Sequence, residues 1–331
     1  MEGMMMVEAL LNGNKEAKIR AANELTELPS KQRHTLVECG VIAPLVSMLD
    51  SQDIVTTEAA LFALLSLAFG SERNKIRIVK SGAIPVIVKL IQHQTDLIEP
   101  AVAALLILSS CTKTKLAIAA SGAVEHLVSM LNTPNNCIAM QAKLDSIATL
   151  HNLSICEQII PLLVSSGIIL SLLQVAYDFN KSSKLVEKAL GLLENIASSS
   201  DLGLQEISET GGAIRTLVEA LEEGSLQCRE YAVAILFLVC QSCREKYKGL
   251  ILREGVMPGL LQVSIDGTWR AKEMARGLLQ LLRDFSDCGS RRKQLKNVIL
   301  EEIMKEIDAK EKSTEVEALR LVEDIIAKLK A

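Results

Sequence analysis

The chain has 331 residues, of which 49% are apolar and only 3% aromatic, and its formal net charge is −4. Such a weakly acidic chain offers no electrostatic reason to bind along a nucleic-acid backbone. No stretch approaches the ~18 uninterrupted apolar residues of a membrane helix, and the N-terminus lacks the basic flank of a signal peptide. We therefore expect an intracellular protein without nucleic-acid partners or membrane insertion, with an aliphatic helical core.

The first 29 residues are predicted to form an incomplete opening unit. An amphipathic helix is expected from about Asn14 to Leu28, where Pro29 stops it. After this unit a phrase of glycine followed by small and apolar residues recurs, at Gly40, Gly82, Gly122, Gly167, Gly212 and Gly255. The spacings are 42, 40, 45, 45 and 43 residues. Spacings of about 40 to 47 residues are typical of two- or three-helix solenoid repeats.

The recurring glycine is expected to adopt left-handed backbone angles and to let two helices approach closely. In the third unit, Lys113–Ala120 and Ala123–Leu131 are predicted as two short helices, and a longer helix is predicted over 137–154. Each unit therefore has three helices. The full units are placed near 30–70, 71–111, 112–155, 156–200, 201–243 and 244–288.

Residues 289–331 are predicted to close the stack, with charge-rich helices at Glu301–Ala309 and Thr314–Leu329. A polar outer face is what the last layer of a solenoid needs. The predicted fold is all-α: one right-handed superhelical solenoid of three-helix repeats over 1–331, with an N-terminal cap at 1–29, six full repeats at 30–288 and a C-terminal cap at 289–331. Arg291-Arg292-Lys293 is either a solvated helix face or a nuclear signal.

No motif predicts catalysis, a cofactor or a metal site. Cys240 and Cys243 have the spacing of a redox or metal pair, but no second Cys or His pair lies at zinc spacing and no strand precedes them. Structural thiols are the simpler interpretation, and a disulfide framework is not expected. The four histidines lie in four different regions, and no order of Ser, His and Asp suggests a nucleophile.

Three segments carry a resemblance to a known family. Asn74–Pro85 reads NKIRIVKSGAIP, Leu150–Ser154 reads LHNLS, and Gly267–Ala275 reads GTWRAKEMA. These resemble armadillo repeats, and among them most closely the armadillo domains of plant U-box ubiquitin ligases and their armadillo-only relatives. The resemblance covers nearly the whole chain. A U-box would need several tens of residues before the repeats, so we expect no ligase activity of the chain's own.

The resemblance implies that the third helix of each repeat lines a groove, where a recurrent asparagine holds an extended peptide. A carboxamide offers both a donor and an acceptor to such a backbone. Alignment of the third helices places Ser66, Ile107, Asn152, Asn195, Leu238 and Leu281 at this register. Only Asn152 and Asn195 keep the amide, which disfavours a nuclear-transport receptor for basic signals. These two amides either bind a client or hydrogen-bond within the protein.

A glutamate recurs eight residues before the asparagine register. The six positions hold Glu58, Glu99, Leu144, Glu187, Glu230 and Glu273. These glutamates either complement the helix dipole or form an acidic rail that favours basic clients. Three aromatic residues are possible anchors. Phe62 is expected to pack in the core or between repeats, Trp269 at a helix start is expected to be exposed, and Tyr231 is left open.

The sequence therefore predicts a non-catalytic scaffold in the cytoplasm, the nucleus or both. Its client is a protein or peptide bound on the third helices, with a ubiquitin ligase or E2 complex as a further partner. The alternatives are a substrate-recognition subunit for a separate U-box ligase and, less favoured, a nuclear-transport receptor. The residues predicted to contact the client are Ser66, Asn152, Glu187, Asn195, Glu230, Tyr231, Trp269 and Glu273.

Overall fold

The computed structural model describes residues 2–93, 95–134 and 137–283, which are largely helical and include no strand. The predicted closing unit, its two helices and Arg291-Arg292-Lys293 lie outside these residues. The α-helices are α1 Glu2–Asn12, α2 Lys15–Glu27, α3 Ser30–Glu38, α4 Ile42–Leu49, α5 Ile54–Ala68, α6 Glu72–Lys80, α7 Ala83–His93, α8 Ile98–Ser109, α9 Lys115–Ala119, α10 Ala123–Asn132, α11 Met140–Ser154, α12 Ile160–Ser165, α13 Ile168–Asp178, α14 Lys184–Ser199, α15 Asp201–Glu209, α16 Ala213–Glu223, α17 Leu226–Ser242, α18 Arg244–Arg253, α19 Met257–Asp266 and α20 Trp269–Leu282. Three 3₁₀ turns, Thr95–Leu97, Thr112–Thr114 and Glu157–Ile159, precede α8, α9 and α12.

The chain forms two compact units, Met1–Ile168 and Ile169–Ala331. The division falls inside the predicted fourth repeat, at the start of α13. The single domain predicted over 1–331 stays a prediction, and each unit is described by itself.

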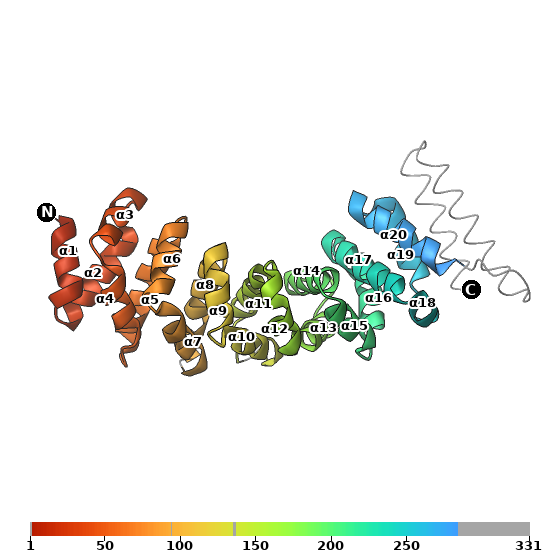
Figure 1. Ribbon diagram of the computed structural model, residues 1–331, viewed down its shortest axis with the longest axis horizontal. Coiled ribbons are helices and arrows are strands. Elements are labelled where there is room, and N and C mark those ends of the chain that lie inside the picture. The colour runs from red at the N-terminus through yellow and green to blue at the C-terminus, as the bar shows by residue number, and fades with distance from the viewer. Residues whose placement is uncertain (1, 94, 135–136, 284–331) are drawn as a thin grey trace, which may run out of the picture. The chain divides into compact units, whose positions relative to one another are not determined.

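In the first unit, three layers of three helices follow the opening pair α1 and α2 (Figure 1). Helix α1 is an addition to the single helix predicted for residues 1–29. The third helix of each layer packs on the next, in the order α2, α5, α8 and α11. Leucine, isoleucine, valine and alanine fill the space between layers, and Leu61, Leu105 and Leu150 are wholly buried. These aliphatic side chains therefore form one continuous core in the first unit.

The second unit is built in the same way from α13 to α20 (Figure 1). Its third helices α14, α17 and α20 pack in succession, and α16 packs on both α17 and α19. Hydroxyl side chains begin these three helices: Ser183, Ser225 and Thr268 each accept a backbone N–H at the N-cap. Such caps satisfy one of the orphan donors of a helix start, which explains why each third helix begins where it does.

The recurring glycine has the left-handed conformation that was predicted. Its φ lies between 75° and 91° in all six repeats, for example 78° at Gly122 and 83° at Gly212. The predicted close approach of helices at this position is wrong. A Cβ built on any of the six glycines would meet no heavy atom within 4 Å. The repeat therefore requires glycine for its backbone angles alone.

Helix α11 begins at Met140, three residues later than predicted. Cys137 donates its N–H to the Pro134 carbonyl in a turn, and Ala139 is extended with ψ 141°. The apolar pattern extends past this start because Ile138 is apolar without being helical.

Within the described residues, no single helix is both long and apolar enough to cross a bilayer. Two pairs of consecutive helices are long and apolar enough when each pair is counted as one segment, but each pair is sharply bent. These pairs are Ile98–Ser109 with Thr112–Ala119, and Met140–Ser154 with Glu157–Ser165.

Candidate protein-binding faces on the third helices

The third helices present two surfaces, one in each unit. We call the surface of α5, α8 and α11 the first face and that of α14, α17 and α20 the second face. Residues four apart along a helix share a side, so the asparagine register, the position four before it and the glutamate register all lie on these faces.

At the asparagine register of the first face, the polar side chains bond within the protein. Asn152 Nδ2 donates to Ser109 Oγ at 3.0 Å, which ties α11 to α8. The guanidinium of Arg33 on α3 donates to the Ser66 carbonyl at 3.1 Å and to the Ser66 hydroxyl. An arginine at the C-terminal end of α5 also complements the helix dipole. Both side chains therefore connect helices, and part of the amide of Asn152 is already used.

The second face keeps one amide at this register. Asn195 on α14 is half-buried, and the two following positions hold the apolar side chains of Leu238 and Leu281, also half-buried. Two of three positions therefore lack a donor and acceptor pair for an extended backbone.

On the first face, the carboxylates of the glutamate register pair with no cation among the residues that the structure describes. Glu58 and Glu99 are exposed, and neither forms an ion pair with a described residue. Leu144 occupies the third position, with Asp145 beside it. Partial burial raises the pKa of Asp145; the hydrogen bond from Gln141, at 2.8 Å, opposes this and the charge of Glu99 adds to it.

Glu187 and Glu273 of the second face differ in whether a cation lies nearby. Glu187 pairs with Lys184 at 2.6 Å and accepts a hydrogen bond from Ser225 Oγ at 3.2 Å. The hydrogen bond from Lys184 is the main reason why the pKa of Glu187 lies below its ordinary value of 4.5. Glu273 is exposed and forms no ion pair with a described residue. The glutamate register therefore has different surroundings in the two units.

Arg270 connects all three helices of the second face. Its guanidinium, on α20, lies 2.6 Å from Glu194 of α14 and 3.2 Å from Glu230 of α17. Both carboxylates are largely buried, with 13% and 12% of each side chain exposed, and Thr268 Oγ1 also donates to Glu230. The guanidinium bridges the two carboxylates, so each of them already has a partner within the protein.

Aromatic rings fill the second face at the position four before the asparagine register. A Cβ on Gly191 would lie 3.2 Å from the Tyr231 ring, and one on Gly277 would lie 2.8 Å from the Phe237 ring. Both rings belong to α17 and therefore cover a glycine on each neighbouring third helix. The pKa of Tyr231 is raised, first by burial and then by the nearby carboxylates of Glu230, Glu187 and Glu194.

The expected packing of Phe62 is wrong, because 45% of this side chain is exposed. Its neighbours Leu61 and Leu64 take the buried positions of α5, so Phe62 is left on the first face. Trp269 has the predicted exposure, at 79%. Trp269 is the first residue of its helix, and three other third helices also begin with an exposed large apolar residue. The four residues are Ile54, Met140, Leu226 and Trp269.

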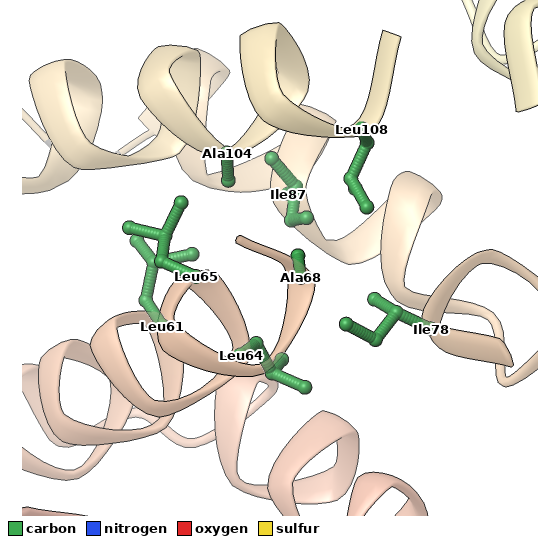
Figure 2. Close-up of a pocket in the computed structure, with 8 residues that line it drawn as sticks. All are labelled: Leu61, Leu64, Leu65, Ala68, Ile78, Ile87, Ala104 and Leu108. Carbon is green, nitrogen blue, oxygen red and sulfur yellow. The ribbon is translucent and has the colours of Figure 1, made fainter. Parts of the chain in front are cut away.

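A small cavity lies in the core of the first unit (Figure 2). Leu61, Leu64 and Leu65 of α5 point toward Ile78, Ile87, Ala104 and Leu108, and Ala68 completes the wall. Its volume of about 10 Å³ is at the lower limit for one water molecule, and its lining has no polar side chain to hold one. The cavity is therefore a gap in packing and not a ligand site.

The described residues contain no group of three or more His, Cys, Asp or Glu side chains that could hold a metal ion. Cys240 is buried in α17, which raises its pKa, while Cys243 is exposed at the cap of α18. The pair therefore has one inert and one accessible thiol.

Layers of three short helices, with a left-handed glycine between the first and second of each layer, define an armadillo-repeat protein. Family comparison agrees: residues 29–69 match the armadillo/β-catenin-like repeat. Residues 125–299, more than half of the chain, match the plant U-box protein ARM repeat region. The chain belongs to this plant family.

Curated relatives are U-box proteins of Arabidopsis thaliana. U-box domain-containing protein 45 is 29% identical over 242 residues, which cover 72% of this chain and 30% of the relative. U-box domain-containing protein 6 is 34% identical over 209 residues, 62% of this chain and 24% of the relative. The chain thus spans less than a third of the length of these relatives.

Solved structures show the same fold. An engineered protein has a TM-score of 0.75 at 22% identity, covering 98% of this chain and 78% of its own. A designed armadillo repeat protein in complex with the peptide (KR)4 has a TM-score of 0.56 at 18% identity, covering 86% of this chain and all of its own.

The sequence interpretation missed Arg270 and Glu194, and it also missed the pair of Lys184 and Glu187, for which a signal was present. Arg270 is the second residue of α20, and Lys184 stands at the same register in α14. A cation three residues before the glutamate register would have indicated a partner for Glu187 on its own helix, but not the pairing of Arg270 with Glu194 and Glu230 of neighbouring helices.

Proposed function

We propose that this chain is a non-catalytic protein-interaction scaffold that binds a protein client on its third-helix faces. The exposed apolar residues at the starts of four third helices are the observation that carries the proposal. Ile54, Met140, Leu226 and Trp269 are 45%, 43%, 54% and 79% exposed. Large apolar side chains at a repeated exposed position are costly to solvate, and in repeat proteins the interaction surface extends along the stack.

Site-specific photo-crosslinking tests this proposal. A photoreactive amino acid replaces Met140 or Trp269 in cells that contain the native partners. The matched control replaces Leu202 on α15, a first helix, where the side chain is 72% exposed. The same client should crosslink from both third-helix positions and not from Leu202. Equal crosslinking from Leu202, or none from the third helices, would contradict the proposal.

A second candidate function is substrate recognition for a separate U-box ligase. It is favoured by the match of residues 125–299 to the ARM region of plant U-box proteins. In a reconstituted reaction with E1, E2, a U-box ligase and the crosslinked client, the chain should increase client ubiquitylation several-fold. An unchanged rate, together with no co-purification of E2 or ligase, would remove this candidate.

Cytoplasmic and nuclear localisation is also part of the proposal, on the strength of the sequence alone. A fluorescent fusion imaged in plant cells would show signal in both compartments. Replacement of Arg291, Arg292 and Lys293 by alanine should deplete the nuclear signal if these residues act as a nuclear signal, and should change nothing if they form a solvated helix face.

A further inference from the structure

The first face is acidic around Glu58 and Glu99, and the cations at the C-terminal ends of its helices, Arg33 and Lys75, are hydrogen-bonded to Ser66 and Ser110. Glu58 is the only charged residue of α5, and Glu99 is the only one of α8. Helix α11 contains Asp145 and one lysine, Lys143, which is 2% exposed. Lys143 Nζ donates to the carbonyls of Thr133 at 2.5 Å and Leu131 at 3.3 Å, so its charge is held at the C-terminal end of α10.

The adjoining helix α2 does not supply the missing cation. Lys15 pairs with Asp53, the N-cap of α5, at 2.8 Å. Lys18 and Arg20 form no ion pair with a described carboxylate. Glu58 and Glu99 therefore form no ion pair with a cation of α2.

The same face exposes apolar side chains among these carboxylates. Phe62 lies one helical turn after Glu58 on α5 and is 45% exposed. Ile54 and Val55 at the start of α5 and Met140 at the start of α11 are 45%, 56% and 43% exposed. The pattern is complementary to a partner that offers apolar and positive groups together.

The second face shows what the chain does where no such partner is needed. Its carboxylates at Glu187, Glu194 and Glu230 pair with Lys184 and Arg270, and rings cover Gly191 and Gly277. Both faces have the same helical register, but Glu273 is the one carboxylate of these four on the second face without a described ion pair, whereas Glu58 and Glu99 of the first face both lack one.

We infer that the first face binds a basic segment of another protein, in which lysine or arginine side chains alternate with aliphatic ones. This inference rests on the proposed scaffold function and names its client chemistry. The cations pair with Glu58 and Glu99, and the aliphatic side chains cover Phe62 and the start of α5. Neighbouring helices lie about 8–10 Å apart, which is roughly three residues of extended chain.

The probe is a nine-residue fluorescent peptide with three Lys-Leu-Ser repeats, titrated into the full chain at low salt. One control peptide has glutamate in place of lysine, and another has serine in place of leucine. The basic probe should bind, and its affinity should fall as ionic strength rises. The acidic peptide should bind at least tenfold more weakly, and loss of the leucines should weaken binding several-fold.

Matched variants assign the binding to the first face. Glu58→Gln combined with Glu99→Gln should weaken the basic probe about tenfold, because each exposed ion pair contributes a few-fold. Glu273→Gln has the same register and is also exposed, but lies on the second face, and should leave binding unchanged. Phe62→Ala should weaken binding several-fold, whereas Leu202→Ala, at the exposed first-helix position of α15, should not. Circular dichroism melting curves verify that the variants fold.

Equal loss with Glu273→Gln, preference for the acidic peptide, or no binding up to about 1 mM would overturn the inference. Client crosslinking from Met140 and Trp269 is measured independently of charge. If crosslinking succeeds while the basic probe fails, the scaffold function stands and the client chemistry is wrong. If both fail, the proposed function itself is rejected.

Discussion

The two third-helix faces share one repeat pattern and differ in how their polar groups are satisfied. On the first face, Glu58 and Glu99 are exposed without a cation and Phe62 projects from the surface. On the second, Arg270 joins Glu194 and Glu230 across three helices. The position of a side chain on a third helix therefore follows from the armadillo repeat. Whether that side chain is free to bind a client depends on residues one or two repeats away.

Removal of Arg270 should have the largest effect on stability. Arg270→Ala leaves Glu194 and Glu230 without their shared cation while each is about seven-eighths buried. Uncompensated buried charges cost about 3–5 kcal/mol, but Arg270 itself is 42% exposed and solvent screens the loss, so we expect roughly 1–3 kcal/mol. Urea unfolding gives the free energy, and hydrogen exchange should show faster opening of α14, α17 and α20.

Combination with Glu194→Gln and Glu230→Gln is the control for Arg270→Ala. If the loss comes from unpaired charge, the triple variant should recover part of the stability. The first-face substitution Glu99→Gln should change stability by less than about 0.5 kcal/mol, because this side chain is exposed. A loss in the triple variant as large as the sum of single losses would show that the cluster is not a coupled unit.

The next largest effect on stability should come from a leucine in place of a second-face glycine, and the same register of the first face should tolerate leucine. Gly277→Leu places a Cβ 2.8 Å from the Phe237 ring, so the ring must move. Overpacking costs about 1–3 kcal/mol and the better helix propensity of leucine returns somewhat less than 1 kcal/mol, which leaves a net loss of about 1–2 kcal/mol. The control is Ala103→Leu at the same register of α8, where we expect a change within about 0.5 kcal/mol. Similar losses at both positions would remove this distinction between the faces.

The sequence predicted the repeat well because the repeat depends on local chemistry. A left-handed turn requires glycine, and Gly122 or Gly212 can be recognised from its neighbours alone. The helix predicted from about Asn14 begins there because the Asn14 side chain caps it, whereas the helix predicted from 137 begins three residues later, after Ala139, which has no capping side chain. Phe62 was expected to be buried because phenylalanine usually is. In the structure Leu61 and Leu64 fill the core positions of the helix, and Phe62 is left exposed.

Which face residues form ion pairs could not be predicted, because their partners are distant in sequence. Glu230 and Arg270 are separated by 40 residues, and Glu194 and Arg270 by 76. Alignment of repeats identified the glutamate register, but it did not show which glutamates have a cation nearby. That property follows from the packing of α14, α17 and α20, which brings the three side chains together.

Glu187 and Asp145 should contribute to the pH dependence of stability with opposite signs. These effects should be the smallest of the series, because water partly screens both carboxylates. The pKa of Glu187 is lowered in the folded protein, chiefly by its hydrogen bond from Lys184, with Ser225 and Lys188 adding to the effect. Glu187 therefore stabilises the fold above its ordinary pKa of 4.5, and this contribution is lost as the pH falls through the folded value. Glu187→Gln should lower the unfolding free energy at pH 7 and have no such effect at strongly acidic pH.

Asp145 on the first face should behave in the opposite way. Its folded pKa is raised above the ordinary value of 3.8 by burial, while Gln141 opposes the rise and Glu99 adds to it. The charged form is therefore a cost to the fold at pH 7, and that cost disappears as the pH falls through the folded pKa toward 3.8. Asp145→Asn keeps an acceptor for Gln141 and should raise the unfolding free energy at neutral pH, but not at pH 3. Urea unfolding of both variants across this range measures the two differences. Changes of the same sign at pH 7 would mean that the first-face carboxylate has a cation after all, and the contrast between the faces would then not hold.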